Sequence, residues 1–244
     1  MRPHTADIPL PQIATRRVRR PGLPWAFAMW MAVSAAIAVG AGLVLGILAA
    51  LETGYGLDRW TQSVQAHGRL QLWAFAGVFI VAVAFEFVVR MNGRPQFSPW
   101  LRMAVPGGLA FGALLQAAGQ VWHDSVQYLG PAGGVVMVGA SAAFAVAVAR
   151  ARPPHSLRLD PQPWFIWLSG AWLVIASAMA LAASLNWEEG TSLPVESHTV
   201  AEVFLRGFVL QVILAIAPRA LGGHMGLRPI DARKQIVLLV IVNV

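Results

Sequence analysis

The chain of 244 residues contains no cysteine and a single lysine, and charged residues make up only 12% of it. Without cysteine there is no disulfide, thiolate metal ligand or cysteine nucleophile. A bound metal or haem would need histidine, methionine, carboxylate or backbone ligands. A soluble domain carries about 25% charged residues. The low charge, with 57% apolar residues and a mean hydropathy of +0.61, therefore predicts a protein that resides in a bilayer.

The motifs of common soluble enzymes are also absent from the sequence. It has no glycine-rich phosphate loop, no nucleophile elbow and no HExxH pair of metal ligands. These absences argue against a soluble enzyme. They leave open whether the chain catalyses a reaction in the membrane.

Long apolar runs recur along the chain, each near or above the ~20 residues that cross the hydrocarbon core. They predict an all-α, polytopic transmembrane helix bundle over 24–244, preceded by an Arg-rich cytoplasmic tail over 1–23. The predicted spans are 25–51, 70–89, 103–122, 129–149, 164–186 and 199–217. A seventh run, 236–244, would make only about 14 Å of helix. We expect it to be the incomplete start of a span in a longer protein, with a half-inserted final helix as the alternative.

The basic residues indicate how the bundle is oriented. Fifteen of the 18 precede the first span or follow the second, fourth and sixth spans. The other side has only Arg59 and the boundary residue Arg69, and Arg206 alone lies within a span. By the positive-inside rule the N-terminus is cytoplasmic. The net charge of +7 is then a topology signal, so the bilayer is the expected partner and nucleic acid is not. The oligomeric state stays open.

Three of the six histidines fall at the predicted outer ends of spans. His67 opens the second span, His123 closes the third and His198 opens the sixth. Neutral imidazole is the commonest metal ligand, and helix bundles build cofactor sites from inward-facing side chains. A shared metal or haem site is one interpretation. The other is that these histidines only suit the membrane interface. Gln71 lies one turn beyond His67 on the same helix face.

The sixth span carries an unusual polar series. His198, Glu202 and Arg206 follow one another at intervals of four residues and share a helix face. Because ionised groups are costly in lipid, we expect an inward-facing Glu202–Arg206 pair. Such a pair could fix helix packing, line a proton or transport path, or place Arg206 near a haem propionate. Near the opposite boundary, Glu86 has Arg90 as its expected partner at i+4.

Two segments carry a resemblance to a known family. "HGRLQLWAFAGVFIVAVAFEFVVRMNGRP" (67–95) and "APRALGGHMG" (217–226) resemble signatures of the NnrS family of bacterial haem- and copper-containing membrane proteins. The opening of the first segment is also similar, more loosely, to the haem-ligand helix of haem–copper oxidase subunit I. The resemblance covers about 55 residues. Arg69 stands where the family has a second histidine, and Glu202 where it has a helix histidine.

The resemblance implies a multi-pass bacterial inner-membrane protein with a b-type haem, with copper as a second candidate metal. It would bind a diatomic gas and be linked to nitric oxide, nitrosative stress or denitrification. The cofactor-binding candidates are His67, His198, His123, Gln71 and Arg206, and the metal-ligand candidates are His67, His198 and Glu202. Two alternatives remain. One is a channel or transporter that uses Glu202 and Arg206, and the other is a membrane scaffold without a cofactor.

Overall fold

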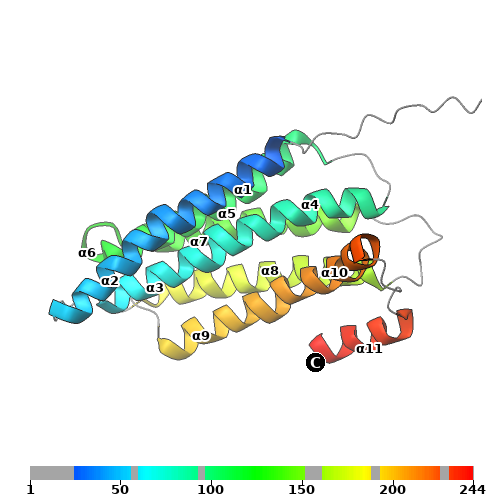
Figure 1. Cartoon of the computed structure of the whole chain (residues 1–244). Helices are drawn as coiled ribbons and strands as arrows, with labels where there is room; N and C mark the ends of the chain where they lie inside the picture. Colours follow the sequence, from blue (N-terminus) through cyan, green and yellow to red (C-terminus); the bar gives the residue numbers. More distant parts are fainter. Residues whose placement is uncertain are drawn as a thin grey trace, which may run out of the picture.

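The computed structural model describes residues 25–55, 60–92, 97–151, 161–187, 193–225 and 231–243. These residues form helices and contain no strand. Within these ranges, six helices are long and apolar enough to cross a membrane. They pack side by side with roughly parallel axes (Figure 1). The predicted all-α, polytopic helix bundle is therefore confirmed.

Several of the spans are built from more than one helical element. In chain order the elements are α1 (Trp25–Ile37), η1 (Ala38–Gly42) and α2 (Leu43–Tyr55) in the first span; α3 (Trp60–Arg69), η2 (Leu70–Gly77) and α4 (Val78–Asn92) in the second; α5 (Pro99–Val121) in the third; the short α6 (His123–Val126); α7 (Leu129–Arg150) in the fourth; α8 (Gln162–Leu185) in the fifth; α9 (Pro194–Glu202), η4 (Val203–Val209) and α10 (Leu210–Met225) in the sixth; and finally α11 (Ala232–Asn243).

The second span begins well before its apolar run. Its helix starts at Trp60 rather than near Leu70, so His67 lies two turns inside the helix. The side chains of these extra turns are polar, but neighbouring helices provide hydrogen-bond partners for them. Gln65 accepts a hydrogen bond from Gln120 of α5 (3.1 Å). Because such bonds offset the cost of burying polar groups, hydropathy alone places the start of this helix too late.

Glycines let the third, fourth and fifth spans approach closely. A Cβ built on Gly108 of α5 would lie 2.9 Å from the Cβ of Ala140 on α7. A Cβ on Gly112 would meet the Met137 side chain at 2.5 Å, and one on Gly134 would meet Leu181 of α8 at 2.9 Å. Real Cβ atoms do not come so near. These small residues therefore set the distances between α5, α7 and α8, as expected for packing in lipid.

Aromatic rings join the second, fourth and sixth spans at the centre of the bundle. The ring centroids of Trp73 and Phe204 lie 4.4 Å apart. Phe204 contacts Phe208 (5.4 Å), which packs edge-on against Phe144 (6.1 Å). Phe144 in turn contacts Phe85 edge-on at 5.4 Å. Edge-to-face and tilted pairs of this kind add to the packing energy of the rings.

The two ends of the bundle are polar in different ways. At the end where α4 and α5 meet, Arg102 donates a hydrogen bond to Glu86 at 2.7 Å. Trp30 of α1 donates to the Arg102 carbonyl at 2.9 Å, which ties the first span to this corner. The expected partner of Glu86 was Arg90, whose side chain lies outside the described residues. The opposite end contains His67.

Candidate functional site

His67 is held by the first span. Its Nδ1 lies 2.6 Å from the carbonyl oxygen of Gly42. A carbonyl oxygen can only accept, so Nδ1 carries the proton and donates. In the neutral ring the lone pair is then on Nε2. The fixed tautomer is the one a histidine needs if it ligates a metal through Nε2, because metal-binding histidines usually donate their other ring N–H to a carbonyl or carboxylate.

Gln71 lies on the same face of the second span, as its spacing predicts. Its Nε2 donates to the carbonyl of Ala38 at 3.3 Å. Both carbonyl acceptors belong to η1, a π-helical segment, in which the usual i→i+4 pattern is broken. Gly42 and Gly46 provide the close approach, since a Cβ on Gly42 would overlap Gln71 and one on Gly46 would lie 3.3 Å from the His67 ring. His67 and Gln71 therefore link the first two spans.

Arg69 points into the bundle rather than to the membrane boundary where its position in the sequence places it. Its Nη1 donates to Gln116 Oε1 at 3.0 Å, and its guanidinium lies 5.1 Å from the ring centroid of Trp187. Gln116 is fully buried and donates from Nε2 to the Ala180 carbonyl at 3.3 Å. The guanidinium is thus fixed by a hydrogen bond and by an aromatic face.

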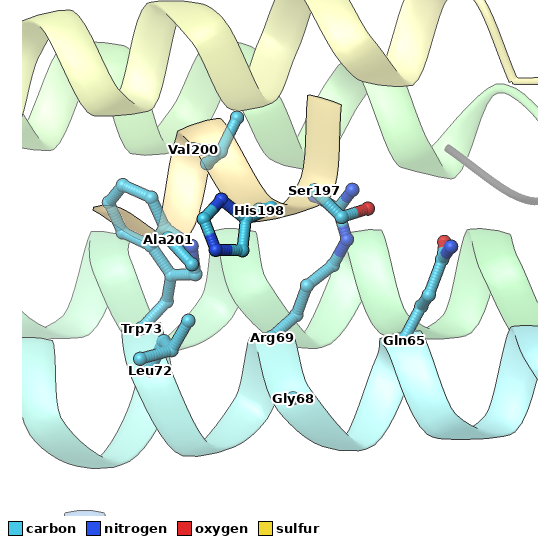
Figure 2. A pocket seen from close by; sticks show the side chains of 9 residues that line it. All are labelled: Gln65, Gly68, Arg69, Leu72, Trp73, Ser197, His198, Val200 and Ala201. Atoms are coloured by element: carbon cyan, nitrogen blue, oxygen red, sulfur yellow. The ribbon is translucent and has the colours of Figure 1, made fainter. Parts of the chain in front are cut away.

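A cavity of about 280 Å³ lies beside Arg69, between the second span and α9. Figure 2 shows the Arg69 side chain rising from α3 toward the α9 helix that carries Ser197 and His198. The other lining residues are mainly apolar, and they are Gln65, Gly68, Leu72, Trp73, Val200 and Ala201. The volume is just below the ~300–1,000 Å³ of typical small-molecule pockets. The cavity therefore combines one fixed cation with apolar walls.

The Glu202–Arg206 pair exists, but it does not face inward as predicted. Arg206 Nη2 lies 2.9 Å from Glu202 Oε1, and His198 Nδ1 lies 4.0 Å from Glu202 Oε2. The Arg206 and His198 side chains are each 74% exposed and Glu202 is 42% exposed. The inward faces of this helix are taken by Phe204, which is fully buried, and by its neighbours in the aromatic core. The expectation of an inward pair was wrong because these large rings occupy the interior.

The remaining candidates lie apart from one another. His123 opens the short helix α6, and its Nδ1 is buried without a hydrogen-bond partner in the described part of the chain. His67 is not among the residues that line the cavity, whereas His198 is. Among the described residues, no three His, Asp or Glu side chains are close enough to share a metal ion.

Sequence reasoning missed the glutamines of the third span. Gln116 and Gln120 are fully buried and lie one turn apart on α5. They bond to Arg69 and Gln65 of the second span. Two amides at i and i+4 in an apolar helix are themselves a signal, because a buried amide requires partners.

The fold and these polar contacts define an integral membrane protein of the helical-bundle class. No protein-family model, curated protein or solved structure matches the chain.

Proposed function

We propose that this chain is a haem protein of the bacterial cytoplasmic membrane, with its N-terminus inside, in which His67 would hold the haem iron. The observation that supports this most directly is the hydrogen bond from His67 Nδ1 to the Gly42 carbonyl (2.6 Å). It selects the tautomer with a free Nε2 and restrains the ring. A histidine that only packed the two helices would need the same bond, but its Nε2 would not act as a metal ligand.

The donor chemistry suits haem iron, which is commonly held by a histidine. The carbonyl of Gly42 would orient the ring and fix its tautomer. Gln71, one turn away, would hold the same two helices together through Ala38. When bound, the haem would supply diatomic-gas binding or electron transfer, and nitric oxide is the gas that the resemblance suggests.

The alternatives draw less support from the described residues. A transporter using Glu202 and Arg206 would need them along a polar path, but both side chains lie on the outside of the bundle. A scaffold without a cofactor would use His67 only to join the first two spans. Detection of bound haem would distinguish the proposed haem protein from a scaffold without a cofactor.

The test is a reduced-minus-oxidised optical spectrum of the protein purified in detergent from a haem-replete host. We expect a Soret band in the native protein, its loss in His67→Gly, and its recovery when imidazole is added to that variant. His198→Ala is the matched control, because His198 is exposed and should leave the band unchanged.

Imidazole recovery shows that a lost band reflects a missing ligand rather than a misfolded bundle. A reduced native protein that binds nitric oxide should also shift its Soret band. A native protein without a Soret band, or an unchanged band in His67→Gly, would refute the proposal.

A further inference from the structure

The sixth span carries a charged pair on its outer surface. Arg206 and Glu202 are joined at 2.9 Å, with 74% and 42% of their side chains exposed. Within the described residues α11 packs against η4 and, at its end, against α8, where Trp172 Nε1 donates to Asn243 Oδ1 at 2.8 Å. The two charged side chains nevertheless stay exposed beside it.

The pair lies near the middle of the span. At about 1.5 Å per residue, Arg206 is roughly 15 Å along the axis from Glu196 and roughly 18 Å from Pro218, the two limits of the span. It therefore cannot be explained as an interfacial arginine close to water. A guanidinium facing lipid at this depth is among the most costly placements for any side chain.

The surroundings of the pair are apolar and also uncovered. Leu205 is 44% exposed and Ile213 is 49% exposed. With Glu202 and Arg206 they form an outward stripe along the helix, and we call these four residues, Glu202, Leu205, Arg206 and Ile213, the Glu202–Arg206 face. Figure 1 shows α9 and α10 at the edge of the bundle, with α11 alongside only part of their length.

We propose that the Glu202–Arg206 face is the contact surface for a second copy of this chain. Two copies inserted in the same orientation would be related by a two-fold axis along the membrane normal. In an isologous contact the same surface patch of both copies is used, so if one residue contacts a second residue of the other copy, the reverse contact also forms. Because Glu202 and Arg206 are one turn apart, Arg206 of each copy lies within reach of Glu202 of the other. The face is thus complementary in charge to itself.

Association would also remove the pair from lipid. The two glutamates and two arginines would form a neutral cluster with Leu205 and Ile213 packed around it. Interhelical polar contacts of this kind drive association of membrane helices, since lipid offers no competing partner. This inference does not depend on haem, so the dimer and the cofactor can each fail without the other.

The absence of native cysteine makes the test direct. Leu205→Cys places a thiol on the proposed face, and a two-fold axis brings it near its own copy. Ile175→Cys on α8 is the matched control, since Ile175 is 43% exposed and also lies well within a span. Oxidation in native membranes should give a covalent dimer with Leu205→Cys and only background with Ile175→Cys.

Charge reversal then tests the chemistry of the contact. Adding Arg206→Glu to Leu205→Cys should lower cross-linking to the level of the Ile175→Cys control. Adding both Glu202→Arg and Arg206→Glu should restore it, because the swapped pair is again self-complementary. That recovery also shows that the reversed chain still folds.

Three outcomes would overturn the proposal. The first is no covalent dimer with Leu205→Cys, and the second is a dimer that charge reversal leaves unchanged. The third is cross-linking of a cysteine on this face to a different protein in place of the second copy.

Discussion

The ion pair between Glu86 and Arg102 gives the most quantitative prediction for this fold. It joins α4 to α5 at 2.7 Å, and the two side chains are only 12–14% exposed. Surface pairs are worth about 0–1 kcal/mol because water screens them. This pair is much less exposed, so breaking it by removing one partner should be far more costly.

The expected magnitude follows from what the change leaves behind. Glu86→Gln removes the carboxylate that lies 2.7 Å from the Arg102 guanidinium, and Arg102→Gln removes the guanidinium that lies 2.7 Å from the Glu86 carboxylate. Loss of one partner from a buried pair costs about 3–5 kcal/mol. The two changes break the same ion pair, so the double variant should lose less stability than the sum of the single variants, with a coupling free energy of roughly 2 kcal/mol. The Trp30 bond to the Arg102 carbonyl survives all three changes, since its acceptor is backbone.

The assay is equilibrium unfolding in mixed micelles with increasing denaturing detergent, followed by tryptophan fluorescence. Arg102→Lys is a useful intermediate, because it keeps the charge but loses the planar fork of donors. It should be less destabilised than Arg102→Gln. Additivity of the two Gln variants to within about 0.5 kcal/mol, the usual result for independent sites, would contradict this reasoning.

Two further predictions concern the interior, and the same unfolding assay checks both. Gly112→Ala should destabilise the bundle, because the new Cβ would meet Met137 at 2.5 Å, whereas Gly139→Ala on α7 has open space and should stabilise it by about 0.5–1 kcal/mol. Equal effects of the two changes would argue against the close α5–α7 contact. Gln211 is fully buried, and neither end of its amide has a hydrogen-bond partner in the described part of the chain. Gln211→Leu should therefore stabilise the bundle by about 1–3 kcal/mol, and a loss of stability would point to a ligand or water on that amide.

The class of this protein could be predicted from sequence because the bilayer imposes simple requirements. Each span needs about 20 apolar residues, so the run over 25–51 is sufficient to place the first one. Helix ends were harder to place. The polar turns from Trp60 to Arg69 extend the second helix, since Gln116, Gln120 and backbone carbonyls of the first span compensate them.

The residues on one face of a helix were also predictable, since 3.6 residues make a turn. His67 and Gln71 share a face, and so do Glu202 and Arg206. What each face contacts depends on which helix lies beside it, and spans that are apolar on all sides give little indication of which side is buried.

The sequence by itself therefore determined that this is a helical membrane protein without thiol chemistry, and which polar residues share a helix face. Only the tertiary structure decided that His67 donates to Gly42, that Glu86 pairs with Arg102 and that Arg206 faces outward. The physical reason is that helix periodicity and bilayer thickness are local constraints. The partner of a side chain is instead set by helix crossings, which depend here on glycines and aromatic rings far apart in the sequence.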